Sequence, residues 1–331
     1  MNPQLEHWLS RFEALCRPGP DGYRWSHREP GTRAGREVVF SAMIHGDEYG
    51  TLPATVRLIE ALKAGTIAYT GPVTVLLGNP EAARAERRFL DFDLNRAWVF
   101  EIDRPGHEPR RARELRPILD RAHLLLDMHQ TILESETSFW IFPWDPVFGL
   151  WARVLGSAPV GLTRTPGQAF AAGGLRCVDE YVRESGRTGF CVEFGRKGFD
   201  DTQADNAFRS MKRMLETFER IELEHTTLEA EADRGEPIRW YTTIRQEDWG
   251  DPARRLRAGL KNWSAVQAGV DLADAGSPPI VPIADGVVLF PKYPDAGEPL
   301  PSHLFHLAIP LSRHPSEEFG GSPIELEKKI D

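Results

Sequence analysis

The chain has 331 residues, 41% of them hydrophobic, which is enough for one large domain with a buried core and a smaller second domain. Its formal net charge of -9 at pH 7 disfavours unspecific binding to nucleic acid or to an anionic membrane surface. The sequence has no run of about 18 apolar residues, and its N-terminus lacks the basic start and apolar core of a signal peptide, so we expect a cytoplasmic protein without a membrane span.

Two kinds of segment alternate from about residue 24 to residue 221. Apolar, β-leaning runs predict strands, and apolar residues spaced three or four apart predict helices. The predicted strands are 37–44, 72–78, 122–128, 137–142 and 189–194, and the predicted helices are 49–63, 109–121, 146–155 and 202–221. This alternation indicates an α/β fold with a mixed, mostly parallel central sheet flanked by helices.

The character of the sequence changes after about residue 222. Short β-type runs at 238–244 and 286–290 lie between turns that contain Gly and Pro. We therefore predict two domains, an α/β domain over residues 1–222 and a smaller β-rich domain over residues 223–331.

The end of the first predicted strand carries the strongest functional signal. His45 and Glu48 follow this strand directly, and Gly46 between them permits a sharp turn. The strand predicted at 122–128 likewise ends in polar residues, and His129 follows it. Ligands in open α/β sheets bind beyond the carboxyl ends of strands, and two histidines with one carboxylate are a known ligand set for catalytic zinc. We predict one Zn²⁺ per chain, held by these three residues.

The spacing of the first pair is weak evidence without this context. His314 and Glu317 have the same spacing, and His303 and His306 form a further pair. All four lie in a Pro-rich part of the chain, so the spacing alone does not identify a metal site. Two strands that both end in metal-type residues are less expected by accident than one isolated pair.

Three further groups are candidates for chemistry. Glu193 ends the last predicted strand, where a carboxylate near a metal can move a proton between water and a leaving group, although a capping or salt-bridged Glu is the alternative. Asn95 and Arg96 can hold a substrate carboxylate, since guanidinium binds it bidentately, although a surface Arg is the alternative. Arg88 is a candidate for the same pocket. The aromatic run at 139–144 favours core packing over a pocket wall.

Other chemistries find no support in the sequence. It contains no Gly-x-Ser-x-Gly elbow, phosphate loop, dinucleotide fingerprint, His-Glu-x-x-His helix or Cys-x-x-Cys pair. Cys16, Cys177 and Cys191 are odd in number and unpatterned, which fits a reducing cytoplasm. We expect Cys191, within an apolar strand, to be a packing residue.

Four motifs together resemble the succinylglutamate desuccinylase/aspartoacylase family, a branch of the zinc carboxypeptidase-like hydrolases. In chain order, over residues 37–220, they are His45-Gly46-x-Glu48, Asp93-Leu94-Asn95-Arg96, Asp127-x-His129 and Glu193-Phe194-Gly195. The resemblance implies zinc bound by the His45, Glu48 and His129 side chains. It also implies Glu193 as general base and acid, Asn95 with Arg96 on the substrate carboxylate, and Arg88 as the group that polarises the scissile carbonyl. The tail after residue 222 is similar to the family's smaller β domain.

The sequence departs from the family pattern in several places. Asp47 stands where Asn is usual and adds a negative charge beside the site, and Gln130 stands where Thr is usual. Aspartoacylases have a further substrate-binding Arg before the catalytic Glu. Arg183 stands at the corresponding distance before Glu193, and Arg187 is the second candidate. Tyr293 is the candidate for a Tyr that the family's β domain contributes.

The predicted activity is zinc-dependent hydrolysis of the linear amide in an N-acyl amino acid or a related small amide that bears a carboxylate. The same residues also suit a carboxypeptidase for acidic C-terminal residues of a peptide or a modified protein. A metal-free binding protein on the same fold is a third alternative. We expect a small N-acyl amino acid or an acidic peptide as the partner and neither nucleic acid nor membrane. A homo-oligomer is compatible with the sequence. The sequence does not identify the acyl group or the amino acid of the substrate.

Overall fold

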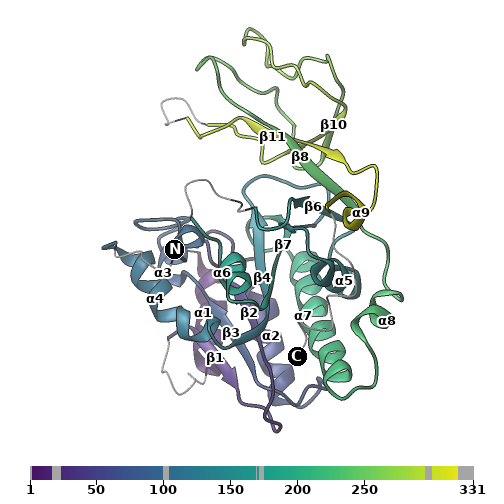
Figure 1. Ribbon diagram of the computed structural model, residues 1–331. Helices are drawn as coiled ribbons and strands as arrows, with labels where there is room; N and C mark the ends of the chain where they lie inside the picture. Colours follow the sequence, from purple (N-terminus) through teal and green to yellow (C-terminus); the bar gives the residue numbers. More distant parts are fainter. Residues whose placement is uncertain are drawn as a thin grey trace.

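The computed structural model describes residues 2–16, 24–99, 104–168, 170, 175–294 and 300–319. One sheet of eleven strands runs through this part of the chain, with helices on both faces (Figure 1). The strands are β1 (Ser26–Glu29), β2 (Glu37–Ala42), β3 (Val73–Leu77), β4 (Ala122–Thr131), β5 (Phe139–Pro143), β6 (Val160–Arg164), β7 (Thr188–Arg196), β8 (Arg239–Glu247), β9 (Ser264–Val266), β10 (Gly286–Leu289) and β11 (Phe305–Pro310). The helices are α1 (Pro3–Leu15), α2 (Leu52–Lys63), α3 (Pro80–Arg84), the 3₁₀ helix η1 (Leu94–Arg96), α4 (His107–Leu119), α5 (Pro146–Leu155), α6 (Val178–Glu184), α7 (Asp201–Glu222), α8 (Leu228–Ala232) and α9 (Pro315–Phe319).

The sheet has the strand order β1-β3-β2-β4-β7-β5-β6-β8-β11-β10-β9. Five neighbouring pairs are parallel, and they lie between β3 and β8. The other five pairs are antiparallel. The predicted α/β class and mixed sheet are confirmed, but the mostly parallel character is not confirmed for the sheet as a whole. Strand β8 pairs with β6 and so continues the same sheet beyond residue 222. The division of the chain into two domains at this residue therefore stays a prediction.

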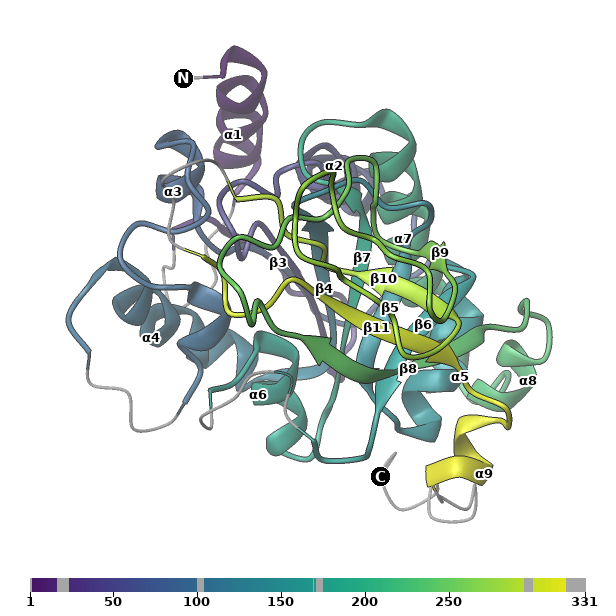
Figure 2. The same ribbon diagram turned by 90° about the horizontal axis from the view of Figure 1, so that it is seen from above.

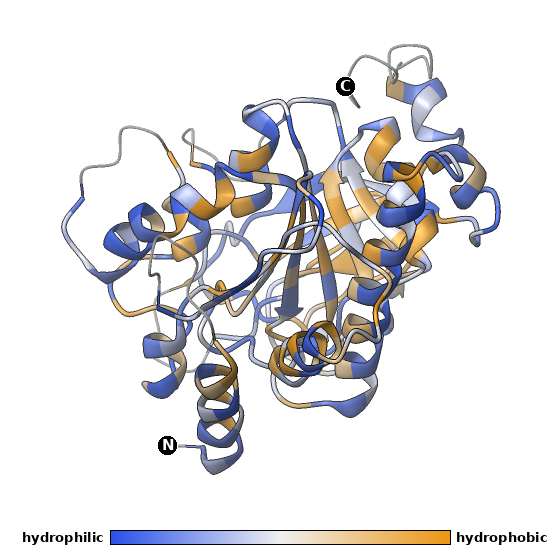
Figure 3. Ribbon diagram, turned by 90° about the horizontal axis from the view of Figure 1, so that it is seen from below, coloured by the Kyte–Doolittle hydropathy of each residue, from blue (hydrophilic) through white to orange (hydrophobic). Residues whose placement is uncertain are grey.

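Helices cover both faces of the central strands, and this explains their unbroken apolar sequences. Side chains alternate between faces along a strand. Val38 and Phe40 accordingly pack in a core with α1, α2, α5 and α7, whereas Val39 packs in a second core with η1, α4 and α6. Figure 3 shows hydrophobic residues on the central strands and on the helix sides that face them. Strands buried on both faces read as apolar runs, which is why the sequence predicted them.

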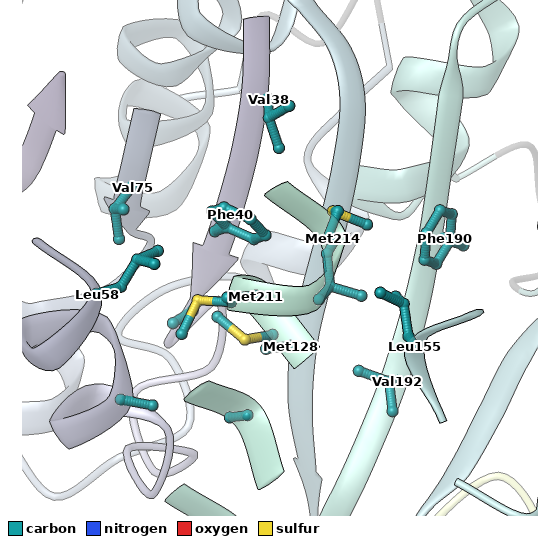
Figure 4. Close-up of a cluster of buried hydrophobic side chains, with 14 of the residues drawn as sticks. Val38, Phe40, Leu58, Val75, Met128, Leu155, Phe190, Val192, Met211 and Met214 are labelled. Atoms are coloured by element: carbon teal, nitrogen blue, oxygen red, sulfur yellow. The ribbon is translucent and has the colours of Figure 1, made fainter. Parts of the chain in front are cut away.

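The larger core lies between the sheet and α7. Figure 4 shows Phe40, Met128 and Phe190 from three neighbouring strands pointing toward Met211 and Met214 of α7. Phe190 also packs edge-on against Trp140, with 5.9 Å between the ring centroids. The aromatic run at 139–144 is buried, as predicted. This packing fixes β4 and β7 side by side.

The segment after α8 forms a layer over the carboxyl ends of the central strands. Seen from above, β8, β10 and β11 lie across β4 to β7 (Figure 2). Asn262 joins the two parts, because its backbone nitrogen donates to the carbonyl of Glu134, 3.0 Å away, and its Oδ1 accepts from the Phe290 backbone, 2.7 Å away. The loop after β4 is therefore attached to this layer. No helix in the described ranges combines the length and the apolar character that a membrane span requires.

Removal of the Phe190 ring is expected to destabilise the core strongly. The side chain is fully buried between β7 and α5, so Phe190→Ala should lower the free energy of unfolding by about 3–5 kcal/mol in urea denaturation. Phe190→Leu, which keeps most of the volume, should lose less. A loss below about 1 kcal/mol in Phe190→Ala, within the ordinary range of single substitutions, would contradict this packing.

Candidate metal and substrate site

The ends of two neighbouring strands carry the three predicted metal ligands. His45 and Glu48 lie in the turn after β2, and His129 lies in β4, which pairs with β2 in parallel. The turn requires glycine at position 46, because a Cβ atom on Gly46 would lie 2.5 Å from the backbone nitrogen of Ala83. This close approach explains why Gly46 separates the two candidate ligands.

The side chains of these three residues converge on one point. Nδ1 of His45 lies 2.8 Å from Oε1 of Glu48, and Nδ1 of His129 lies 2.8 Å from Oε2 of the same carboxylate. All three side chains are buried, and Nδ1 of His45 forms no hydrogen bond with any described residue. Two imidazole nitrogens and a carboxylate, with one donor atom unused, fit a metal ion such as Zn²⁺.

Each of the two histidines has a second carboxylate near its Nε2 atom. Nε2 of His129 lies 2.8 Å from Oδ2 of Asp127, whose Oδ1 accepts a 2.6 Å hydrogen bond from Ser41. Nε2 of His45 lies 3.1 Å from Oδ1 of Asp93. The Asp127 carboxylate holds the Nε2–H tautomer of His129 and leaves its Nδ1 for a metal, the arrangement usual around metal-bound imidazoles.

The charges at this point act strongly on one another. Burial works to raise the pKa of Glu48, but the positive charges of His45 and Arg88 hold that pKa well below its usual range. Burial works to lower the pKa of His129, but the carboxylates of Asp127 and Glu48 raise that pKa well above its usual range. Glu48 is therefore ionised, as a metal ligand must be.

Glu193 brings another carboxylate to the same edge of the sheet. It lies in β7 and is the cross-strand neighbour of His129. Its Oε2 is buried and has no hydrogen-bond partner among the described residues. Burial and, second, the negative charge of Glu48 raise the pKa of Glu193 to about 7. A carboxyl group with a free oxygen and such a pKa can accept and return a proton at neutral pH.

Arg88 contacts two of the three predicted ligands and lines the same cavity. Its Nη1 donates to Oε1 of Glu48 at 2.6 Å, and its Nη2 lies 2.8 Å from Nε2 of His45. The side chain is 30% exposed, so the guanidinium is also accessible to a ligand.

Asn95 and Arg96 form the next part of the site. Oδ1 of Asn95 accepts from the backbone of Val178 at 2.9 Å, which fixes the orientation of its amide group. Nη1 of Arg96 donates to the carbonyl of Asn95 at 2.7 Å and contacts Sγ of Cys177 at 3.1 Å. Among the described residues, no carboxylate forms an ion pair with Arg96.

A second arginine, Arg164, joins Arg96 in a way that the sequence did not predict. Both guanidinium groups lie 5.6 Å from the ring centroid of Phe170, one from η1 and the other from β6. Arg164 is also paired with Glu180 at 2.8 Å. The ring and two cations together suit a planar anion such as a carboxylate.

Seven of the eight predicted site residues line one cavity of about 750 Å³. They are His45, Glu48, Arg88, Asn95, Arg96, His129 and Glu193. Cys191 is buried beside them in an apolar cluster, as expected for a packing residue. Lining residues that the sequence did not single out for this site include Arg164, Gln246, Lys292, His303 and His306.

Arg183, the eighth, lines other cavities. Its guanidinium pairs with Asp179 and donates to the carbonyl of Gly189. Arg187 donates to the carbonyl of Leu119, and the hydroxyl of Tyr293 bonds to the backbone near residue 260. The substrate-binding role of Arg183 stays a prediction without support from its position.

The two departures from the family pattern have defined contacts. Oδ2 of Asp47 pairs with Nζ of Lys197 at 2.6 Å, so a cation offsets the additional negative charge. Gln130 accepts from the backbone of Gly50 at 2.7 Å and donates to the carbonyl of Arg196 at 3.0 Å. Gln130 therefore ties β4 to the turn after β2 and to β7.

Comparison with known families and sequences points to one family. The family model described as the succinylglutamate desuccinylase/aspartoacylase catalytic domain matches residues 34–221, more than half of the chain. A succinylglutamate desuccinylase of Pseudomonas aeruginosa is 30% identical over 226 residues, which cover 63% of this chain and 63% of that protein. The chain thus matches less than two thirds of the length of this relative.

Solved structures show the same fold. A succinylglutamate desuccinylase of Vibrio parahaemolyticus superposes with a TM-score of 0.66 at 16% identity, covering 87% of each chain. Murine aminoacylase 3 superposes with a TM-score of 0.58 at 19% identity, covering 86% of this chain and 96% of its own. At these identities the likeness concerns the fold alone.

Asp127 is expected to strengthen metal binding through His129. Asp127→Ala removes the acceptor of Nε2, so the imidazole loses its fixed orientation, and the affinity for zinc should fall about 10- to 100-fold. Competition with a chromophoric chelator measures this. Asp205→Ala, in an exposed ion pair with Arg57, is the matched control and should bind zinc like the wild type. An unchanged affinity in Asp127→Ala would contradict the role.

Proposed function

The chain belongs to the succinylglutamate desuccinylase/aspartoacylase family, and from this premise we propose that it hydrolyses the amide bond of an N-acyl amino acid, or of a related small amide with a carboxylate, using one bound zinc ion. The observation that carries the proposal is the convergence of the His45 and His129 Nδ1 atoms on the Glu48 carboxylate, beside Glu193, whose Oε2 has no hydrogen-bond partner in the described part of the chain. We propose that this site acts in the cytoplasm and that residues 223–331 form a smaller β-rich domain over it.

Each residue has a role in the proposed reaction. His45, Glu48 and His129 would hold the zinc ion, which would supply Lewis acidity for the attack of water. Oε2 of Glu193 takes the proton as water attacks the acyl carbonyl and then returns it to the departing amine. Arg88 donates to the carbonyl oxygen as negative charge develops on it, which stabilises the transition state.

The substrate carboxylate is assigned to the end of the cavity around Arg96. Its guanidinium and that of Arg164 flank Phe170, and Asn95 holds the adjacent backbone through its bond to Val178. Arg88 and Glu193, to which the proposal assigns the amide bond, line the same cavity as Arg96.

A carboxypeptidase for acidic C-terminal residues is the second candidate. It would use the same ligands, base and carboxylate clamp. The cavity volume of about 750 Å³ is near the upper end of the range for small-molecule sites, so it leaves room for more than a short acyl group. A panel of N-acyl amino acids and acidic dipeptides and tripeptides, assayed for amine release, separates the two candidates.

Glu193→Ala is expected to remove proton transfer and to keep the metal. The rate of amide hydrolysis should fall about 10²- to 10⁴-fold, while zinc content stays at the wild-type level because Glu193 is not a ligand. Steady-state kinetics with elemental analysis of the same samples measures both quantities. Glu134→Ala, in an exposed ion pair with Arg196, serves as the control. Full activity in Glu193→Ala would remove it from the proposed mechanism.

A further inference from the structure

A second cavity lies at the amino ends of the central strands, opposite the ends that carry the candidate metal site. It has a volume of about 130 Å³ and lies between α5, α7 and α8, which pack against one another (Figure 1). Leu124 and Thr188, which are cross-strand neighbours at the starts of β4 and β7, line it, whereas His129 and Glu193 lie further along the same strands. None of the described residues around it lines the cavity of the candidate metal site. We call it the amino-end cavity.

One wall of the amino-end cavity is aromatic. Phe148 and Trp151 of α5 and Phe218 of α7 line it, and the centroids of the Trp151 and Phe218 rings lie 6.2 Å apart. The imidazole of His123 stacks on Phe218, with 5.7 Å between the ring centroids and 21° between the planes. Since an apolar cavity of about 150 Å³ can bind benzene, this wall and this volume suit a ligand with one aromatic ring.

The polar part of the amino-end cavity is mainly basic. Arg36, Arg183 and Arg187 line it, and Asp145 is the one acidic side chain that the described part of the chain contributes to its lining. Oδ1 of Asp145 caps α5, because it accepts from the backbone nitrogen of Val147 at 2.9 Å. The positive charges in the lining therefore outnumber the negative one.

Arg187 differs from the other two arginines because it has no counterion. Glu222 pairs with Arg36 at 3.6 Å, and Asp179 pairs with Arg183. Arg187 is half-buried, and its hydrogen bonds in the described ranges go to backbone carbonyls near the end of α4. No described carboxylate lies within ion-pair distance of it. A partly buried cation without a partner is costly, so an anion beside Arg187 would stabilise it.

The arginines lie close to the aromatic wall. Burial and, second, the positive charges of Arg36 and Arg187 lower the pKa of His123 to about 4, so its imidazole is neutral at pH 7 and adds no charge. The guanidinium group of Arg183 lies 5.7 Å from the centroid of the Phe148 ring. A ligand whose ring packs on this wall can therefore carry its anionic group next to a guanidinium.

We propose that the amino-end cavity is a second ligand site, which binds a small carboxylate with one aromatic ring. The ring packs against Trp151 and Phe218, and the carboxylate binds the guanidinium group of Arg187. This inference goes beyond the proposed function and does not depend on it, because the two cavities share no described lining residue. A neutral ring compound leaves the Arg187 charge unpaired, and a carboxylate without a ring leaves the aromatic wall uncovered, so both bind more weakly.

Calorimetric titration with benzoate, benzamide and acetate tests the site. The titrations use the full chain with Arg96→Met, because Arg96 is the residue proposed to bind a carboxylate in the other cavity. Benzoate should bind more tightly than either of the other two probes. Adding Arg187→Met should weaken benzoate binding about 10- to 100-fold, the effect of losing one charged hydrogen bond, and leave benzamide binding unchanged. Adding Arg209→Met instead, at an exposed arginine of α7 outside this cavity, should change neither.

Arg187→Lys separates the charge from a structural role of the side chain. It keeps a cation at this position, so it should retain more affinity for benzoate than Arg187→Met does. Equal losses in the two variants, or a parallel loss of benzamide binding, would overturn the assignment of the carboxylate to Arg187. Equal affinities for benzoate and benzamide before any change at Arg187, or no binding of benzoate at all, would overturn the site even if the Arg187 variants did not fold.

Discussion

The parallel pairing of β2, β4 and β7 is the constraint on which the site depends. It brings the carboxyl ends of three strands to one edge of the sheet, where His45 follows the first strand and His129 and Glu193 lie on the other two. These residues are far apart in the sequence and acquire their common position from strand register alone. The cores on the two faces hold that register, so packing and chemistry are linked through the same strands.

Burial of so many charges is tolerated because most of them are paired. Asp127 and Asp93 stand behind the two histidines, Lys197 offsets Asp47, and Glu180 accompanies Arg164. A buried charge without a partner is costly, so the exceptions are informative. Arg96 and Lys292 have no carboxylate partner among the described residues, and both line the cavity of the candidate metal site.

The sequence predicted the parts of the fold that depend on local patterns. Apolar runs gave β2, β3 and β7 to within two residues, and the predicted helix at 146–155 coincides with α5. There Asp145 caps the first turn, and Gly156 ends the helix with φ +60°. Short elements such as β6 and α6 have too few residues for a clear period. Arg164, Lys292 and His303 were missed for a related reason, since their place in the cavity depends on pairing of β6 with β5 and of β10 with β11.

The central claim is that the chain holds one metal ion through His45, Glu48 and His129. Elemental analysis of zinc per chain, in the wild type beside His129→Ala, tests it most directly, with His123→Ala of the same strand, outside this cavity, as the control. The account predicts about one zinc per chain in the wild type and in His123→Ala, and its loss in His129→Ala. Absence of zinc from the wild type after supplementation, or its full retention in His129→Ala, would contradict the account.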